Sequence, residues 1–526
     1  MIKKNKLRIT MAIVFLPILT LGVVFVLLDR DSGYTSVATD TIHPSSRTLS
    51  PPRPRDMPVE IESFQSIEEA NILLEADGSL WTWGFSGQGL LGVADTWGLA
   101  APAQILDSVT YAAQSGRLAI REDNSLWGWG LEMWGPPRYG RPVPFAPRFI
   151  MDDVVHVIST VRRDFAIRSD NSLWAIDHRM GPRRNVHLVT NTEPVRILDS
   201  VAAVYSTLRA ELILQCGGQL WVLRDDQLTH IMDDVVAVYE RDNLWAVFVP
   251  DTTLVIQADG NLWSVNMLAR GNMSLTHIMG NVSTVFRAYG SNFILGNDTG
   301  LWAMGNNDYG RLGTGNSYHQ SYPVWIMDGA ANVFPLQNRT FVITTCNALW
   351  AWGSNAHGGL GIGSLEDNHL YPAHVMDRAR HIYFSGADTY VVGVDNTLWM
   401  WGNMVYEGTR IITKSPMQIK DYTDRLYIAN RRIFAVDIYN TLWTWQFTWG
   451  SWDLPIHNQP PIPPPRQVLE GVSHVFLDTF NPFISIAFIF PKDGSIWAMG
   501  TNLDELLGDV TRACQYYPVN ISYIFS

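Results

Sequence analysis

Two segments of the 526-residue chain combine aromatic rings with arginine, residue types that suit the recognition of another macromolecule. One segment is 131–148; the other is 446–466, which contains a proline run at 460–465. Their candidate interaction residues are Trp134, Arg138, Tyr139, Arg141, Trp449 and Trp452. Large rings and guanidinium groups supply much of the energy of protein interfaces when a partner covers them. We therefore predict two interaction loops; the alternative is plain connecting loops with some buried rings.

Residues that could perform catalysis form no recognisable constellation. The chain has no HExxH zinc motif, no GxSxG nucleophile elbow and no P-loop. Its 13 histidines are scattered. The three cysteines, Cys216, Cys346 and Cys514, form no CxxC pair, so neither a zinc site nor a disulfide framework is indicated. We predict that the chain is not an enzyme and has no catalytic residue, cofactor or metal.

The charge balance excludes one class of partner. The formal net charge is −12, and four cations crowd the N-terminus: Lys3, Lys4, Lys6 and Arg8. Residues 9–526 therefore carry −12 − 4 = −16. Nucleic-acid binding depends on basic patches that neutralise phosphates, so we predict no nucleic-acid partner. Hydrophobic residues make up 47% of the chain, including 21 Trp, which excludes wholesale disorder.

An uncharged apolar run from Ile9 to Leu28 follows the basic tail 1–8. A run of about twenty residues can cross a bilayer as a helix, and basic residues before it place the N-terminus in the cytoplasm. We predict a single-pass transmembrane signal-anchor at 9–28 in the cell membrane, then an extracytoplasmic Pro/Ser-rich linker at 29–56. The alternative is a cleaved signal peptide, which would remove residues 1–38 and release a secreted protein.

The rest of the chain, 57–526, repeats one unit ten times. In each copy a turn signal such as Asp77-Gly78 runs into Leu-Trp or Ile-Trp, and successive Trp lie 39 to 54 residues apart (302 − 263 and 497 − 443). The ten tryptophans are Trp81, Trp127, Trp174, Trp221, Trp263, Trp302, Trp350, Trp399, Trp443 and Trp497. A further Leu244-Trp245 falls off the period, so we do not count it as a copy.

Each unit predicts a small antiparallel sheet. Asp-Gly and Asp-Asn adopt positive φ readily, which predicts a two-residue type I′ hairpin. Short apolar strands, such as 165–167, precede the turn, and Leu-Trp-x-Trp/Met alternates at the strand period after it. One such sheet cannot bury its face alone and must pack on its neighbours. We therefore assign the ten tryptophans to packing between sheets and not to a ligand.

Four units continue into a glycine loop. Residues 305–313 and 353–361 both read G-x-N-x-x-G-x-L-G, and 84–92 and 500–508 match with one change each. No helical pattern follows these loops, so a structural turn is favoured over a phosphate cradle. These motifs resemble the repeat of the regulator of chromosome condensation family over residues 57–526, in what would be a membrane-anchored, bacterial-type member.

The resemblance implies an all-β fold, a β-propeller of four-stranded blades. We expect about ten blades where the family norm is seven, preceded by one N-terminal transmembrane helix. We predict one large ring; two smaller rings are the alternative.

We predict a membrane-tethered extracytoplasmic scaffold that binds a protein or a cell-envelope glycan through its blade loops. Loops that break the repeat are expected to hold the specificity, because the repeated positions are occupied with packing. The resemblance also implies a guanine-nucleotide exchange regulator of a small GTPase or a chromatin binder, which the anchor and the acidic body disfavour. The third hypothesis is an envelope enzyme acting on polysaccharide, since a propeller face can assemble a site from residues far apart in sequence.

Overall fold

The computed structural model covers most of the repeat region. It describes residues 61–522 apart from 68, 86–88, 95–97, 114–115, 135–140, 161–162, 177, 181–186, 190–192, 208, 225, 241–251, 268–272, 407–408, 430–431, 446–464, 479–485 and 501–514. It also describes 27–28 and 35–36, which form the short paired strands β1 (Leu27–Leu28) and β2 (Thr35–Ser36).

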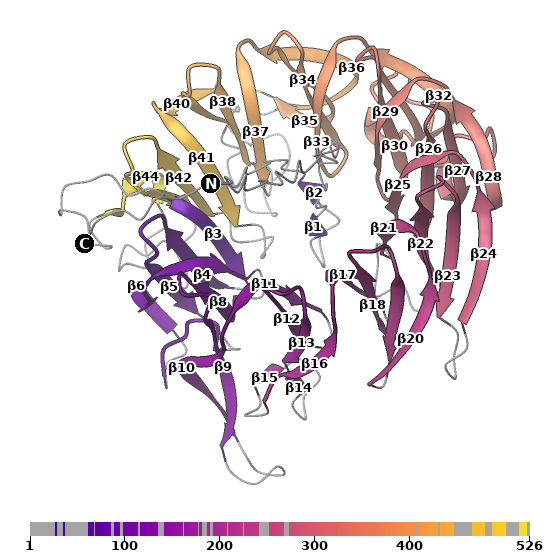
Figure 1. The fold of residues 1–526 in the computed structure, drawn as a ribbon. Coiled ribbons are helices and arrows are strands. Elements are labelled where there is room, and N and C mark those ends of the chain that lie inside the picture. Colours follow the sequence, from indigo (N-terminus) through magenta and orange to yellow (C-terminus); the bar gives the residue numbers. More distant parts are fainter. Residues whose placement is uncertain are drawn as a thin grey trace, which may run out of the picture.

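Ten antiparallel sheets follow one another along the chain, and Figure 1 shows them arranged around a common centre. Each is a blade whose four strands pair in chain order, and we name these strands A to D. Blade 1 comprises β3 (Ile61–Ile67), β4 (Glu69–Glu75), β5 (Leu80–Phe85) and β6 (Gly98–Leu106). Blade 2 comprises β7 (Val109–Ala112), β8 (Leu118–Arg121), β9 (Leu126–Trp134) and β10 (Arg141–Met151). Blade 3 comprises β11 (Val154–Ser159), β12 (Asp164–Arg168), β13 (Leu173–Ile176) and β16 (Val195–Leu198). Blade 4 comprises β17 (Val201–Ser206), β18 (Glu211–Gln215), β19 (Leu220–Arg224) and β20 (Gln227–Met232). Blade 5 comprises β21 (Val235–Tyr239), β22 (Thr252–Gln257), β23 (Leu262–Met267) and β24 (Met273–Met279).

The second half of the ring has the same plan. Blade 6 comprises β25 (Val282–Ala288), β26 (Ser291–Gly296), β27 (Leu301–Gly305) and β28 (Gln320–Met327). Blade 7 comprises β29 (Ala330–Pro335), β30 (Arg339–Thr344), β31 (Leu349–Ser354) and β32 (Asn368–Met376). Blade 8 comprises β33 (Ala379–Ser385), β34 (Asp388–Gly393), β35 (Leu398–Tyr406) and β36 (Thr409–Lys420). Blade 9 comprises β37 (Thr423–Ala429), β38 (Arg432–Asp437), β39 (Leu442–Trp445) and β40 (Arg466–Leu469). Blade 10 comprises β41 (Val472–Asp478), β42 (Ile486–Pro491), β43 (Trp497–Gly500) and β44 (Gln515–Asn520). The prediction of an all-β, ten-bladed propeller with four-stranded blades is confirmed.

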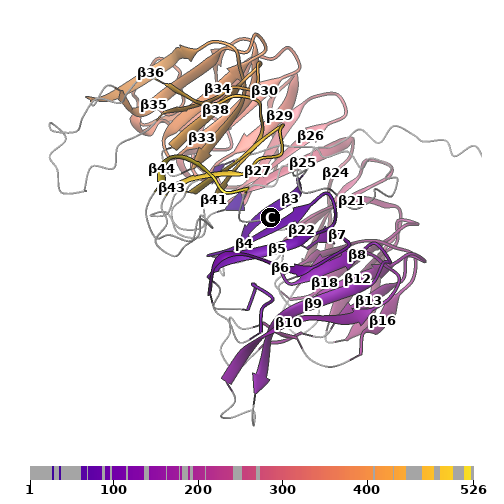
Figure 2. The same ribbon diagram turned by 90° about the vertical axis from the view of Figure 1, so that its left-hand side faces the viewer.

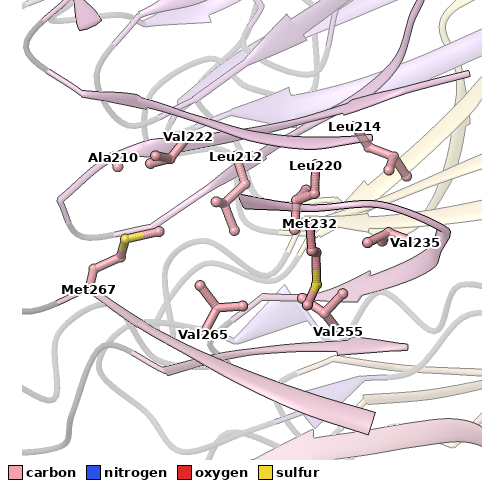
Figure 3. Close-up of a cluster of buried hydrophobic side chains, with 10 residues drawn as sticks. All are labelled: Ala210, Leu212, Leu214, Leu220, Val222, Met232, Val235, Val255, Val265 and Met267. Atoms are coloured by element: carbon pink, nitrogen blue, oxygen red, sulfur yellow. The ribbon is translucent and has the colours of Figure 1, made fainter. Parts of the chain in front are cut away.

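Apolar clusters fill every junction between consecutive blades, as Figure 3 shows for blades 4 and 5. The last junction joins blade 10 to blade 1, where Trp83 meets Phe488 edge-on with ring centroids 5.7 Å apart. The blades therefore form one ring, as predicted, and the alternative of two smaller rings is excluded.

Side chains alternate along each C strand, so every C strand packs into two junctions. In β31, Leu349 and Ala351 are buried in the cluster shared with blade 8, whereas Trp350 and Trp352 pack into the cluster shared with blade 6. Successive side chains of a strand point to opposite faces, so one Leu-Trp-x-Trp segment packs against two neighbours. Burial of both faces is the main stabilising contribution to the ring.

The ten repeat tryptophans lie at the margins of these junctions. Eight of them are partly buried against the clusters: Trp81, Trp174, Trp221, Trp263, Trp302, Trp350, Trp399 and Trp497. Trp127 and Trp443 are also partly buried, with the cations of Arg121 and Lys420 over their rings at 5.3 and 4.1 Å. The fully buried tryptophans occupy the position two residues later, and they are Trp83, Trp129, Trp352 and Trp401.

The turn between the B and C strands differs from the predicted type. In blade 1, Gly78 N donates to Glu75 O and Glu75 N donates to Ser79 O, both at 3.0 Å, so the loop contains three residues. Gly78 has φ +88°, but Asp77 is not among the residues with positive φ. This is a type I turn followed by a left-handed residue, not a two-residue type I′ turn. The carboxylate of Asp77 accepts a hydrogen bond from Ser79 N at 2.9 Å.

A backbone hydrogen bond links this turn to the next blade. Val109 N, at the start of blade 2, donates to Gly78 O at 2.8 Å, and, counting this one, the bond occurs at nine junctions within the described residues. The left-handed residue of each turn therefore aims its carbonyl at the neighbouring A strand. The positive-φ position is occupied by Gly, Asn or, once, Thr299.

The predicted membrane anchor and its flanks lie almost wholly outside the described residues. Of 9–28, only Leu27–Leu28 is described, and within the described part of the chain no helix is long and apolar enough to cross a membrane. The anchor, the linker at 29–56 and the boundary at residue 57 remain predictions.

The glycine loop of one blade makes a close contact with a tryptophan of the next, which gives a stability prediction. A Cβ built on Gly361 would lie 2.6 Å from Trp401 Nε1, whereas one built on Gly471 meets nothing within 4 Å. Both glycines have a left-handed φ, +75° and +69°. We expect Gly471→Ala to cost about 1 kcal/mol from backbone strain alone. Gly361→Ala should cost about 1–3 kcal/mol more through overpacking, measured by urea unfolding.

Equal losses for the two glycine variants would show that Trp401 has room to move, and would contradict a tight contact between blades.

Candidate interaction face

Each blade has two ends with different connections. Because the strands form an antiparallel meander, the B–C turns and the D–A connections lie at one end, and the A–B and C–D connections lie at the other. We call the first end the B–C face and the second the C–D face.

The B–C face is uniform. All ten B–C turns contain the left-handed residue at the same position, and each of the nine D–A connections, such as 107–108, contains two residues. Four turns add the same hydrogen-bond series, in which a Trp Nε1 donates to a Ser or Thr hydroxyl that donates to an Asp. That hydroxyl bond lowers the pKa of all four carboxyls: Asp123, Asp170, Asp395 and Asp493. Many polar groups of this face therefore already have hydrogen-bond partners within their own turn or in the next blade.

The C–D face is variable. The C–D connection has two residues in blade 4 (225–226, between Arg224 and Gln227) and twenty in blade 9 (446–465, between Trp445 and Arg466). Variation in length is therefore confined to connections at one end of the blades. Loops that a rigid scaffold displays in this way are where binding residues concentrate.

Both predicted interaction segments belong to this face. Residues 131–148 span the C–D connection of blade 2, where Trp134 ends β9 and pairs with Arg141 at the start of β10. Arg138, Tyr139, Trp449 and Trp452 lie outside the described residues, as do the side-chain positions of Trp134 and Arg141. The structure thus places the two segments at the same end of blades 2 and 9 and leaves their side-chain roles as predictions.

Blade 2 carries an extension from its neighbour. The C–D connection of blade 3 contains β14 (His178–Met180) and β15 (His187–Val189), which pair with each other. Leu188 of β15 pairs in parallel with Leu131 of β9, so the sheet of blade 2 has six strands. The hairpin of β9 and β10 projects away from the other blades in both views (Figures 1 and 2).

The off-period Leu244-Trp245 lies between β21 and β22, in the A–B connection of blade 5 and outside the described residues. In each of the ten copies the Leu-Trp or Ile-Trp pair stands at the start of a C strand, so the topology agrees with leaving Leu244-Trp245 out of the repeat.

One buried asparagine organises the glycine loop of blade 6, which lies on the C–D face. Asn307 is 0% exposed, and its Nδ2 donates to Asn316 O at 2.8 Å, Tyr318 O at 3.0 Å and Thr314 Oγ1 at 3.0 Å. Its Oδ1 accepts from Leu312 N at 2.8 Å. A single amide therefore joins both arms of the loop, around the short 3₁₀ turn η2 (Asp308–Gly310). In blade 7, with η3 (Ala356–Gly358), Asn355 plays the same part.

The loop is also fixed to blade 7. Trp352 Nε1 donates to Arg311 O at 2.8 Å, and a Cβ on Gly313 would lie 2.8 Å from the same indole nitrogen. Gly315 N donates to Leu370 O at 2.9 Å, and Gly315 lies against the ring of Tyr371. Equivalent bonds join Trp129 Nε1 to Leu90 O and Trp401 Nε1 to Gly359 O. The loop is a rigid platform shared by two blades.

Three exposed tyrosines surround this platform, and we call Tyr309, Tyr318 and Tyr371 the tyrosine cluster. Their exposed fractions are 50%, 78% and 62%. Tyr309 has φ +62°, a conformation that is unfavourable for a bulky residue. Two of them adjoin the loop contacts directly, because Tyr318 O accepts from Asn307 and Tyr371 meets Gly315.

The two arginines near the cluster are buried and the carboxylates are exposed. Arg311 has a side chain only 5% exposed, and its Nη2 lies 3.3 Å from Asp308 Oδ2. Arg339 donates to Ala387 O at 3.0 Å and Gly386 O at 2.8 Å, and burial lowers the pKa of its guanidinium to about 10, so it stays protonated at neutral pH. Glu366 and Asp367 are exposed and form no ion pair with any described residue.

The sequence interpretation missed the tyrosine cluster. The sequence predicts the glycine loop as a structural turn, which agrees with the 3₁₀ turn η2, but that prediction gives its exposed Tyr309 no binding role. A signal was present, because Tyr-Pro recurs near the start of three D strands, at Tyr322, Tyr371 and Tyr517, outside the Leu-Trp register. These three tyrosines are 81%, 62% and 70% exposed.

No group of three or more metal-ligating side chains occurs among the residues that the structure describes. The two described cysteines, Cys216 and Cys346, are free, exposed and located in B–C turns.

Comparisons with known proteins add little to this description. No family model and no curated protein matches the chain. Solved structures with a similar fold include human WBSCR16 (16% identity, covering 56% of this chain and 84% of that one, TM-score 0.35). Another is Prp20p from Saccharomyces cerevisiae, a protein that binds Gsp1p and histones (12% identity, 55% and 76%, TM-score 0.33). BamB from Moraxella catarrhalis is a third (12% identity, 73% and 96%, TM-score 0.30). Scores of this size carry no argument about function, and the architecture rests on the ten sheets themselves.

The buried amide of Asn307 gives a matched prediction. Asn307→Asp replaces the donor with a carboxylate oxygen that would face two carbonyls, so we expect a loss of about 2–4 kcal/mol in unfolding free energy. Asn306→Asp is the control, because the side-chain oxygen of Asn306 accepts from Asp308 N at 2.9 Å, and a carboxylate oxygen can still do so. Urea titration with limited proteolysis at the loop measures both. A loss as large for Asn306→Asp would contradict the assigned role of the amide.

Proposed function

We propose that the chain is a membrane-tethered, extracytoplasmic scaffold that binds a protein or a cell-envelope glycan with its C–D face. The single observation that carries the proposal is the contrast between the two faces. Every B–C turn and D–A connection follows one pattern, whereas the C–D connections differ in length from blade to blade.

The contrast indicates which face binds, because changes in loop length disturb the ring at the B–C face and not at the C–D face. A change in a B–C turn disturbs the bond to the next A strand, as between Val109 and Gly78. A C–D connection leaves the sheet at the rim and can change without opening the ring. The segments rich in aromatic residues and arginine, 131–148 and 446–466, support the same choice of face.

The tether is supported by the sequence of residues 9–28 and the cations before it. An anchored scaffold with an acidic body suits recognition outside the cytoplasm. The absence of HExxH, GxSxG and P-loop motifs from the sequence favours binding over catalysis.

The exposed cysteines allow a test of the location. In spheroplasts, a membrane-impermeant maleimide-PEG should react with Cys216 and Cys346 of the full chain and shift it on a gel without lysis. The chain should stay in the membrane fraction until detergent is added. A variant with all three cysteines replaced by Ser controls for other reactions. Labelling only after lysis would contradict an extracytoplasmic propeller.

The same chemistry tests the binding face. PEG on Cys216 and Cys346 covers the B–C face, in a Cys514→Ser variant because Cys514 belongs to the C–D connection of blade 10. The cysteine-free variant with Ser317→Cys, an exposed position in the loop of blade 6, carries PEG on the C–D face. We expect capture of envelope components by the detergent-solubilised full chain to fall at least fivefold with PEG at position 317 and to change less than twofold with PEG at 216 and 346.

Without PEG, the chain with its B–C face cysteines and the Ser317→Cys variant should capture equal amounts of envelope components, which controls for the substitutions. Loss of capture only when the B–C face is covered would contradict the proposal.

A further inference from the structure

We propose that the tyrosine cluster and the carboxylates beside it bind an extended segment of a protein partner that is rich in arginine or lysine. The inference rests on the proposed function, because the cluster lies on the C–D face. It adds the chemistry of the partner and the place of contact.

The rings of the cluster have the properties of a binding surface. Tyr309, Tyr318 and Tyr371 are each at least half exposed, so their faces are open to a ligand. The face of an aromatic ring carries negative electrostatic potential and attracts ammonium and guanidinium groups within about 6 Å of its centroid. The same attraction already operates within this chain, where Lys420 Nζ lies 4.1 Å from the centroid of the Trp443 ring.

The backbone holds one ring in place at an energetic cost. Tyr309 has φ +62°, and His357 has φ +58° at the same position of the blade 7 loop. Glycine or asparagine would adopt this conformation with less strain. A strained, exposed side chain is a reason to look for a ligand. Here the loop that carries it also carries Tyr318 and contacts Tyr371 through Gly315.

The platform is formed before any partner arrives. Asn307 joins the two arms of the loop, and the contacts of Gly313 with Trp352 and of Gly315 with Leu370 fix the loop to the next blade. Little loop entropy therefore remains to be lost on binding, which favours affinity.

The local charge selects a cation. The loops 305–319 and 353–370 contain three acids, Asp308, Glu366 and Asp367, and a single arginine, Arg311. Arg311 is buried against Asp308, and the exposed His319 has its Nε2 4.0 Å from the other oxygen of that carboxylate. Glu366 and Asp367 are the exposed carboxylates of these loops with no ion pair among the described residues. One exposed lysine, Lys414, adjoins the blade 7 loop from the D strand of blade 8, where its carbonyl accepts from Gly363 N. A phosphate-bearing or acidic ligand would meet repulsion here.

The arrangement of the rings suits an extended segment. Tyr309 and Tyr318 belong to blade 6 and Tyr371 to the D strand of blade 7, with the acids Glu366 and Asp367 shortly before it in the chain. Basic side chains spaced along an extended peptide could reach the cluster and the acids in turn, because such a chain advances about 3.3 Å per residue.

The test uses a fluorescein-labelled octa-arginine peptide and the full chain in a non-ionic detergent, with anisotropy as the measurement. The site variant is Tyr318→Ala with Tyr371→Ala. The matched control is Tyr422→Ala with Tyr439→Ala, two exposed tyrosines of the B–C face whose ring centroids lie 6.2 Å apart. We expect the site variant to weaken binding about tenfold, as the loss of two exposed cation–π contacts implies. The control should change binding less than twofold.

A second pair of substitutions tests the charge. Glu366→Gln with Asp367→Asn should weaken octa-arginine binding at low salt and make the remaining binding less sensitive to added salt. An octa-serine peptide of the same length should not bind. Thermal unfolding temperatures within a few degrees of wild type confirm that each variant is folded.

Several outcomes would overturn the inference. Equal weakening by the site and control variants would mean that the acidic body attracts the peptide without a site. Binding of a neutral oligosaccharide that the site variant abolishes, with no octa-arginine binding, would assign the cluster to a glycan. Concentration-dependent dimerisation that the site variant abolishes would assign it to a second copy of the chain. In each case the proposed function still stands if PEG at position 317 blocks capture, and it fails separately if PEG there has no effect.

Discussion

The ring depends on one contact, the apolar seam in which the leucine face of one blade meets the tryptophan face of the next. Leu349 and Ala351 pack against blade 8, whereas Trp350 and Trp352 pack against blade 6, so a single strand contributes to two seams. Each sheet is apolar on both sides and has no other way to remove these faces from water. Because blade 10 meets blade 1 through the same kind of cluster, removing any one blade exposes two such faces.

The seam also explains a relation between neighbouring units. A tryptophan two residues after the repeat tryptophan tends to follow a unit that carries a glycine loop: Trp129 follows 84–92, Trp352 follows 305–313, and Trp401 follows 353–361. In the structure each of these indoles donates to a carbonyl of the preceding loop and fills the space that its glycines leave. Units after plain connections have Ile176, Leu223 and Val265 there instead. Trp445 is an exception, because no glycine loop precedes it.

The repeat, the sheets and the single ring could be predicted because they follow from periodicity, and periodicity survives in the residues themselves. The turn type could not, since Asp-Gly suits both hairpin geometries and the choice depends on the pairing of Leu74 with Leu80 across the ladder. The packing of the repeat tryptophans between blades could be predicted, but their depth could not, because strand alternation places them at the seam margin and places the second tryptophan in its centre. The tyrosine cluster escaped notice because its exposure depends on how one blade's loop meets another blade's outer strand.

Every blade consists of consecutive residues, and β44 pairs with β43 just as β3 pairs with β4. No sheet borrows a strand from the far end of the chain, so the closing seam resembles the other nine. Such a ring has almost no privileged starting point: it could be opened at any two-residue D–A connection without dividing a sheet, except at 152–153, where β15 of blade 3 pairs with β9 of blade 2. It also has no fixed size, because the duplication or loss of one whole unit leaves every remaining seam chemically intact and changes only the curvature. Blade number in a propeller of this design can therefore drift during evolution while the surface chemistry of individual loops diversifies.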